Sequence, residues 1–170
     1  SGSRINIRVL SAAKFERISG LIGNTPMLEI SLTYKGKKRR IFAKAEYFSL
    51  TGSIKDRVAY YIMKKAYETG TIEKNDIVAE ATSGNTGIGL AAMAGAKGYR
   101  VIIVMPDSMS EERRILMTAY GAELVLTEGS KGMKGAIEKA QILAKEIPGS
   151  FIPGQFDNPA NAMAHESTTG

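Results

Sequence analysis

The sequence lacks cysteine altogether and has a single histidine among its 170 residues. The absence of cysteine excludes disulfide bonds and thiolate metal sites, and no other cluster of metal ligands is visible, so we expect no bound metal. No apolar run approaches the length that a membrane span needs. The first ten residues alternate polar and apolar side chains without the apolar segment of a signal peptide. These absences favour a cytoplasmic protein that does not enter a membrane.

The positive charge of the chain is not concentrated in a recognisable binding motif. The net charge is +6, while 44% hydrophobic and 24% charged residues are typical of a globular protein. The densest basic run is residues 35–40 (KGKKRR), which lies between two apolar segments. No aromatic residue interleaves with it, so a solvated hairpin turn is favoured over a nucleic-acid patch. We expect no nucleic-acid partner.

Short apolar runs alternate with helical stretches from residue 41 onward. Strands are expected over residues 41–46, 77–81, 101–105, 123–127 and 150–152, and helices from Ser53 to Gly70 and over residues 86–97, 110–121, 134–147 and 159–165. The run at 101–105 is uninterrupted, as in a parallel strand that is buried on both faces. The alternation predicts an α/β fold with a parallel sheet. Because the pattern stops at Gly170 without a terminal strand or helix, we expect the fold to be truncated there.

Lys55 is a candidate catalytic residue because it begins a predicted helix just after a glycine turn, residues 51–53 (TGS). The positive end of the helix dipole disfavours an ammonium group at that place. The neutral amine, which a Schiff-base lysine needs, is then easier to reach. For an arbitrary lysine, a solvated side chain on a helix face is the commoner interpretation. Asp56 and Arg57 are interpreted as structural partners rather than as acid–base groups.

A second candidate site is the loop of residues 82–87 (TSGNTG), which joins a predicted strand to a predicted helix. Hydroxyl, amide and free backbone N–H groups gather there at a helix N-terminus, which favours a bound carboxylate or phosphate. In doubly wound sheets, ligands bind at the carboxyl ends of strands. The spacing matches neither a dinucleotide-binding glycine motif nor a P-loop. A polar turn with an N-cap explains the same residues equally well, so both interpretations stay open at this point.

Seven motifs follow one another along the chain. They are residues 22–28 (IGNTPML), 51–57 (TGSIKDR), 82–87 (TSGNTG), 105–106 (MP), 109–114 (MSEERR), 132–136 (GMKGA) and 155–161 (QFDNPAN). Together they resemble the cysteine synthase family, also called the O-acetylserine sulfhydrylases. The resemblance extends over nearly the whole chain, and several motifs in one order are more specific than any single motif.

This resemblance implies the parallel-sheet fold of the tryptophan synthase β-like, fold-type II pyridoxal-phosphate enzymes. Residues 1–45 would begin the larger cofactor domain, residues 46–150 would form the smaller α/β domain, and residues 151–170 would return to the larger domain. The second half of that larger domain would be missing. The implied activity is a β-replacement, in which O-acetylserine and sulfide give cysteine and acetate through an aminoacrylate.

The resemblance also implies roles for individual residues. Lys55 would form the Schiff base with pyridoxal 5'-phosphate and later move the α-proton of the substrate, and Asn85 would hydrogen-bond the ring hydroxyl of the cofactor. The α-carboxylate of the substrate would be held by Thr82, Ser83, Gly84, Thr86 and Gln155. Family members are typically homodimers, and they bind the carboxyl-terminal tail of serine acetyltransferase in the active-site cleft. His165 is not expected to be catalytic.

Two departures and several alternatives accompany the resemblance. Leu50 stands where the family usually has proline, which relaxes the turn before Lys55. The family's glycine-rich phosphate loop and the serine at the pyridine nitrogen are expected beyond Gly170. Another member of the same fold type, a cystathionine β-synthase or a serine dehydratase, is the first alternative, although residues 132–136 and 155–161 favour the sulfhydrylase. The cystathionine β-synthases share much of the pattern, because exchanging sulfide for homocysteine leaves few traces here. The alternative from another class is a non-catalytic fragment that binds a serine acetyltransferase tail.

Overall fold

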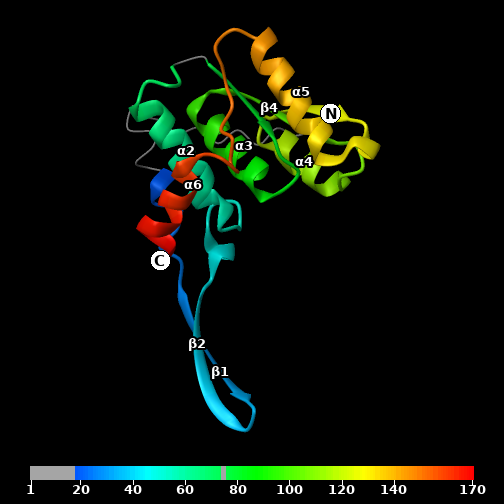
Figure 1. The fold of residues 1–170 in the computed structure, drawn as a ribbon. Helices are drawn as coiled ribbons and strands as arrows, with labels where there is room; N and C mark the ends of the chain where they lie inside the picture. The colour runs from blue at the N-terminus through cyan, green and yellow to red at the C-terminus, as the bar shows by residue number, and fades with distance from the viewer. Residues whose placement is uncertain (1–17, 74–75) are drawn as a thin grey trace.

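Four parallel strands form a central sheet in the part of the chain that the computed structural model describes, residues 18–73 and 76–170 (Figure 1). The strand order is β5-β4-β3-β6. The bounds are β3 (Ile77–Ala81), β4 (Arg100–Pro106), β5 (Glu123–Thr127) and β6 (Ser150–Phe151). All three pairings are parallel, so the predicted α/β class is confirmed. β4 is buried from its second residue onward, as expected of a central strand with helices on both faces.

Helices cover both faces of this sheet. Their bounds are α2 (Lys55–Glu68), α3 (Asn85–Lys97), α4 (Glu111–Ala119) and α5 (Gly132–Glu146). Successive residues of a strand point to opposite faces. Val78 and Ile103 therefore contribute to the core beneath α3 and α4, whereas Ala79 and Ile102 pack against α5 on the other face. α2 lies against α3, which places the first turns of these two helices in the same region.

A long β-hairpin precedes the sheet and extends away from it (Figure 1). It consists of β1 (Met27–Tyr34) and β2 (Lys37–Lys44), which pair in an antiparallel register. Lys35 and Gly36 join the strands with positive φ angles of 48° and 73°, the backbone of a tight two-residue turn that suits the twist of a hairpin. The expected hairpin is confirmed, but its extent was wrong. The basic residues 37–40 belong to β2, where exposed strand positions accommodate them without burial of charge.

Most predicted elements are present with slightly different ends. The strand expected over residues 41–46 is the second half of β2, and Glu46 instead begins the short 3-10 helix η1 (Glu46–Phe48). α5 begins at Gly132, after the 3-10 turn η2 (Gly129–Lys131), rather than at Lys134. These differences are confined to element ends, where turn geometry competes with the helical pattern.

The carboxyl-terminal part returns to the helical layer. α6 (Pro159–Ala164) leads into a π-helical turn, η3 (His165–Thr169), and Asn158 caps α6 by accepting a hydrogen bond from the N–H of Ala160. Ala160 packs against Val58 and Ile62 of α2. The predicted domain limits at residues 45 and 150 stay a prediction, and residues 1–17 of the first segment lie outside the described residues. None of the described helices is both long and apolar enough to cross a membrane.

The core between α3 and the sheet gives a first prediction. Leu90 of α3 is 0% exposed, whereas Ile142 of α5 is 47% exposed. Leu90→Ala should lower the free energy of unfolding by about 2–5 kcal/mol, because it removes buried methyl groups and leaves a cavity. Ile142→Ala is the matched control and should cost less than about 1 kcal/mol. Urea unfolding of both variants measures the difference, and equal losses would contradict the packing described here.

Candidate active site

The turn before Lys55 is fixed by hydrogen bonds to the beginning of α2. Gly52 has φ +83°, a conformation that side chains rarely adopt. The Asp56 carboxylate accepts hydrogen bonds from the Thr51 N–H at 2.7 Å and from the Thr51 hydroxyl. The Ser53 hydroxyl accepts the N–H of Lys55 at 3.1 Å. The turn therefore places Lys55 in the first turn of α2, as predicted.

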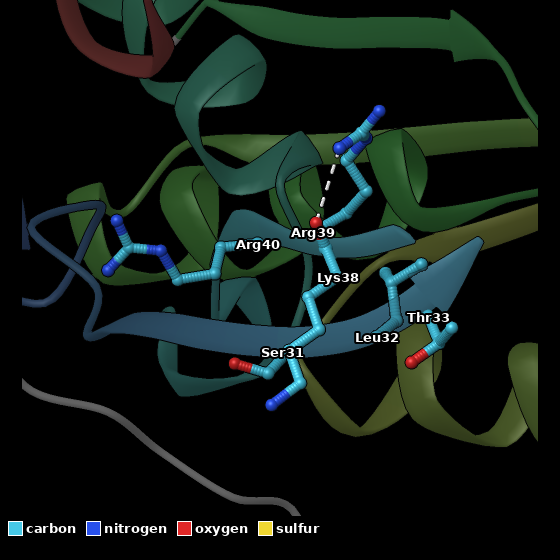
Figure 2. Close-up of a pocket in the computed structure, with 6 residues that line it drawn as sticks. All are labelled: Ser31, Leu32, Thr33, Lys38, Arg39 and Arg40. Carbon is cyan, nitrogen blue, oxygen red and sulfur yellow. Dashed lines mark hydrogen bonds between the residues drawn. The ribbon is translucent and has the colours of Figure 1, made fainter. Parts of the chain in front are cut away.

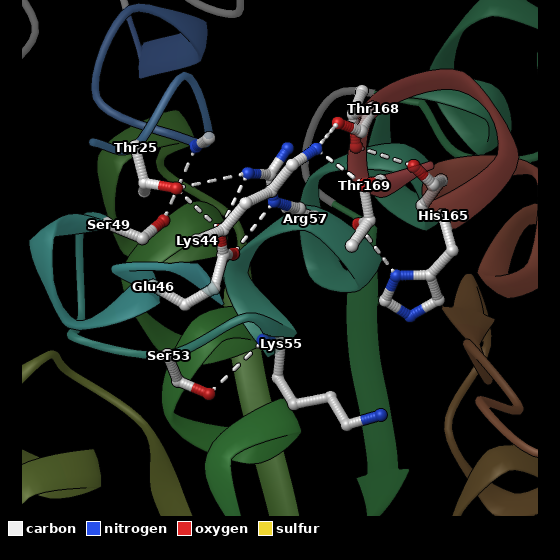
Figure 3. A network of polar contacts seen from close by, with 12 residues as sticks. Thr25, Lys44, Glu46, Ser49, Ser53, Lys55, Arg57, His165, Thr168 and Thr169 are labelled. Carbon is white, nitrogen blue, oxygen red and sulfur yellow. Dashed lines mark hydrogen bonds and ion pairs between the residues drawn. The ribbon is translucent and has the colours of Figure 1, made fainter. Parts of the chain in front are cut away.

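A buried ion pair connects the end of the hairpin to the same helix turn (Figure 3). The Arg57 side chain is 3% exposed and donates to both Glu46 oxygens, at 2.8 Å from Nε and 2.7 Å from Nη2. Thr25 donates its hydroxyl proton to Glu46 at 2.6 Å. The hydrogen bond from Arg57 holds the pKa of Glu46 below its usual value. Asp56 and Arg57 thus have structural partners, in agreement with their interpretation from sequence.

α3 begins directly after β3, so the loop 82–87 lies at the carboxyl end of that strand. Gly84 is the N-cap residue, and the Thr82 hydroxyl accepts its N–H at 3.4 Å. In the described structure the backbone N–H groups of Asn85 and Thr86 have no hydrogen-bond partner, as is usual in the first turn of a helix. From α4, Arg113 donates to the Ser83 carbonyl oxygen at 3.0 Å, which secures the loop from outside.

Gly89 allows α3 to approach α2 closely. A Cβ atom at this position would lie 3.1 Å from the Cβ of Ala59, 3.3 Å from Oδ1 of Asp56 and 3.5 Å from the carbonyl oxygen of Lys55. These separations leave little room for any side chain. The glycine therefore brings the Lys55 turn against the first turns of α3, which carry the candidate anion-binding loop.

These elements surround a cavity of about 270 Å³. Its lining residues are Lys55, Thr82, Ser83, Gly84, Asn85, Thr86, Met133, Gln155 and Phe156. The Lys55 side chain points away from the ion-pair network of Arg57 (Figure 3), and within the described residues its Nζ atom forms no hydrogen bond or ion pair. The cavity thus combines an unpaired amine with unpaired backbone N–H donors.

All residues that the sequence singled out for the site line this one cavity, although the role of each stays a prediction. Sequence reasoning did not select Met133 and Phe156, which also line it. Both lie inside motifs that carried the resemblance, residues 132–136 and 155–161, so the signal was present. Their side chains are apolar, and apolar residues give no chemical hint of a site until the fold places them there.

Glu80 is a further residue that sequence reasoning did not select. It lies in β3, its side chain is 3% exposed, and its Oε2 atom accepts the N–H of Gly154 at 2.7 Å. Burial raises the pKa of Glu80 to about 7, against a lowering effect of the hydrogen bonds from the backbone of Gly154 and Gln155. The available signal was a single charge within the otherwise apolar strand of residues 77–81.

His165 lies away from the cavity lining. Its Nδ1 atom is 2.9 Å from the Thr169 hydroxyl, inside the carboxyl-terminal turn η3 (Figure 3). Lys44 donates to the Thr168 carbonyl oxygen of the same turn at 2.9 Å. The absence of a catalytic role for His165 stays a prediction.

A second, larger cavity of about 580 Å³ lies along the hairpin. Lys38, Arg39 and Arg40 of β2 and residues 31–33 of β1 line it. The Arg39 and Arg40 side chains point in different directions (Figure 2), and Arg39 bonds to the Lys38 carbonyl oxygen at 3.2 Å. Because these cations do not converge on one point, the hairpin cavity lacks the arrangement of an anion site.

Comparison with known proteins decides the family. A model described as pyridoxal-phosphate dependent enzyme matches residues 18–170. The chain belongs to this family. A cysteine synthase from a Flavobacterium species is 53% identical over 156 residues, which are 92% of this chain and 50% of that protein. The chain therefore spans about half the length of the curated relatives it matches.

Solved structures of the family share the fold. A hydrogen sulfide-producing enzyme from Fusobacterium nucleatum is 48% identical, with a TM-score of 0.88 over 94% of this chain and 48% of that chain. An O-acetylserine dependent cystathionine β-synthase from Helicobacter pylori is 37% identical, with a TM-score of 0.80 over 89% of this chain and 50% of that chain. The fold-type II architecture inferred from the motifs is confirmed.

The cavity residues fit the cofactor on which this family depends. Pyridoxal phosphate carries an aldehyde, which requires an accessible amine, and Lys55 lines the cavity with an Nζ atom unpaired within the described residues. The polar side chain of Asn85 and the unpaired N–H groups of the first turn of α3 supply donors for oxygen atoms of a ligand.

The Glu46–Arg57 pair gives a second prediction. Arg57→Met should lower the free energy of unfolding by about 3 kcal/mol, because it leaves the Glu46 carboxylate partly buried without its partner. Arg100→Met is the matched control, since Arg100 forms a similar two-bond pair with Glu123 on the exposed surface. The control should change stability little. Denaturant titration measures both, and a small loss for Arg57→Met would contradict a structural role for the buried pair.

The raised pKa of Glu80 gives a third prediction. The folded state holds a proton on Glu80 up to about pH 7, whereas an unfolded glutamate loses it near its usual value of 4.5. Stability should therefore fall as the pH rises between these values, by about 3 kcal/mol at completion. Glu80→Gln should remove this part of the pH dependence. Unfolding of both proteins from pH 4 to 8 measures it, and parallel stability curves would contradict the raised pKa.

Proposed function

We propose that the protein is a cysteine synthase, which converts O-acetylserine and sulfide to cysteine and acetate. The observation that carries the proposal is the cavity lined both by Lys55, whose amine is unpaired within the described residues, and by the first turn of α3. Relatives named cysteine synthase, at about half identity over the matched residues, support the same reaction class. The coarser conclusion, a β-replacement enzyme of the pyridoxal-phosphate family, is supported by the relatives named cysteine synthase and by the one named O-acetylserine dependent cystathionine β-synthase.

Lys55 would hold the cofactor covalently and then carry the proton that leaves the α-carbon of the substrate. A lysine suits both tasks, because its amine is a nucleophile and, once released, a base. Asn85 would hydrogen-bond the ring hydroxyl of the cofactor. When bound, the cofactor supplies a ring that accepts the electrons left at the α-carbon.

The loop 82–87 would hold the α-carboxylate of the amino-acid substrate. Thr82, Ser83 and Thr86 bring hydroxyl groups, and the first turn of α3 adds backbone N–H donors and its dipole. Gln155, which lines the same cavity, would add an amide donor. A carboxylate held on several sides fixes the orientation of the α-carbon, and this orientation selects which of its bonds reacts.

A cystathionine β-synthase is the second candidate. It is favoured by the likeness to the O-acetylserine dependent cystathionine β-synthase from Helicobacter pylori. The described residues hold the amino-acid part of the substrate, which is common to both reactions, so the nucleophile is the point on which the candidates differ. A homodimer, a serine acetyltransferase tail as partner and a cytoplasmic location stay predictions.

A covalent trapping experiment tests the cofactor part of the proposal. The chain is mixed with pyridoxal phosphate and reduced with borohydride, and the modified peptide is located by mass spectrometry. We expect one modified site, Lys55, and no modification there in Lys55→Ala. Lys64→Ala is the matched control, because Lys64 lies on the same helix but pairs with Glu68 at the surface, and it should react like the parent chain. Modification spread over surface lysines would contradict the proposal.

Product analysis tests the reaction. The cofactor-loaded chain is given O-acetylserine with sulfide, and in a parallel sample with homocysteine. Cysteine formed faster than cystathionine supports a cysteine synthase, and the reverse order supports the second candidate. Specific modification of Lys55 without either product would limit this chain to cofactor binding.

A further inference from the structure

Glu80 occupies a place where a charge is costly. It follows Ala79 in β3, beneath the helices, and the structure records no ion pair for it among the described residues. A buried charge without an opposite charge is retained only where other groups stabilise it. The groups that contact this carboxylate are backbone N–H donors. The reason for a glutamate at this position therefore depends on the segment that carries those donors.

The donors belong to the segment in which the sheet ends. β6 pairs with β3 through Ile77 with Ser150 and Val78 with Phe151, and the pairing stops there. Continued along the strands, this register would place Pro153 opposite Glu80, and proline has no N–H to donate. The Glu80 carboxylate instead accepts the N–H of Gly154 at 2.7 Å and that of Gln155. The Glu80 carboxylate thus takes the place of the backbone hydrogen bonds that would continue the pairing of β3 with β6.

The carbonyl groups of the segment have donors of their own. The side chain of Asn158 donates to the Pro153 carbonyl oxygen at 2.8 Å, and the side chain of Asn161 donates to the Gln155 carbonyl oxygen at 2.8 Å. The Gly154 carbonyl oxygen accepts the backbone N–H groups of Asp157 and Asn158 at 3.0 and 2.9 Å. Gln155 itself is buried and lines the same cavity as the loop 82–87.

We propose that Glu80 is a positioning residue: its carboxylate holds the backbone N–H groups of Gly154 and Gln155 and so fixes Gln155 in the wall of the cavity. The segment would otherwise have two buried donors without partners and several accessible conformations, because Gly154 has φ +60°. The expected effect of Glu80 on substrate binding rests on the proposed function. The positioning of Gln155 by Glu80 rests only on the hydrogen bonds described above.

The protonation state of Glu80 should control how strongly its carboxylate binds the N–H groups of Gly154 and Gln155. An ionised carboxylate accepts N–H groups more strongly than a neutral one. The charged residues on neighbouring elements are Lys55, Asp56 and Arg57 at the start of α2, Lys97 at the end of α3, Arg100 at the start of β4 and Asp157 after the segment. None of them is among the causes that shift the pKa of Glu80, which are burial and the two backbone donors. The hold should therefore strengthen as the pH rises through about 7.

Amide hydrogen exchange of the chain, followed residue by residue by NMR, tests the proposal. Protection of the Gly154 and Gln155 amides, corrected for intrinsic exchange and for the fall in global stability over the same range, should increase between pH 6 and 8. In Glu80→Gln the increase should be absent, and both amides should exchange roughly tenfold faster than in the parent chain at pH 8. Glu123→Gln is the matched control, since it makes the same change at the exposed pair with Arg100 and should leave both amides unchanged.

Unchanged exchange in Glu80→Gln would overturn the proposal, whereas a pH-independent protection in the parent chain would overturn the control of the positioning by protonation. If Glu80→Gln does not fold, Glu80→Asp, which keeps the carboxylate but shortens the side chain, should give the same faster exchange, and unchanged exchange there would overturn the proposal. In the cofactor-loaded chain, Glu80→Gln should also raise KM for O-acetylserine several-fold with a smaller change in kcat. If the proposed function is wrong, the parent chain does not form cysteine from O-acetylserine and sulfide, whereas the exchange measurement, which needs no cofactor, still decides the role of Glu80.

Discussion

The close approach of α2 and α3 is the constraint on which the candidate site depends. Gly89 permits it, and a side chain there would meet Asp56 and the backbone of Lys55. The contact brings together two helix beginnings that come from different parts of the chain. One carries the amine of Lys55, and the other carries the unpaired donors after β3. Neither would form a binding site alone, because each is an ordinary helix N-terminus until the other lies beside it.

Two buried charged groups serve this arrangement in opposite ways. Arg57 has partners on Glu46 and Thr25 and connects the hairpin to the Lys55 turn. Burial disfavours the ionised form of Glu80 and raises its pKa, and backbone donors are the only partners recorded for it among the described residues. The Glu46–Arg57 pair stabilises the fold over the ordinary pH range. The ionised Glu80 lowers the stability of the fold, but it fixes the segment that contains Gln155. A loss of stability that positions a residue is typical of functional sites rather than of cores.

The sequence alone determined the class of the fold and selected residues that the structure brings to one cavity. The uninterrupted run at 101–105 and the alternation of strands and helices are local patterns, and they were enough to predict the parallel sheet. The ordered motifs selected Lys55, Thr82, Gln155 and their neighbours, which do line one cavity. Such local features can be recognised in a sequence because turns, caps and buried strands each favour their own residue types.

Only the tertiary structure decided which groups meet across the chain. Basic residues 37–40 read as part of a turn, yet they extend β2, because a solvated hairpin accepts charged residues at strand positions. Glu80 looked unremarkable within its strand until Gly154 was found beside it, far along the chain. Met133 and Phe156 carry no chemical signal, and the cavity they line exists only after the helices pack. Hydrogen bonds and cavities depend on distances between segments, and a local pattern does not contain those distances.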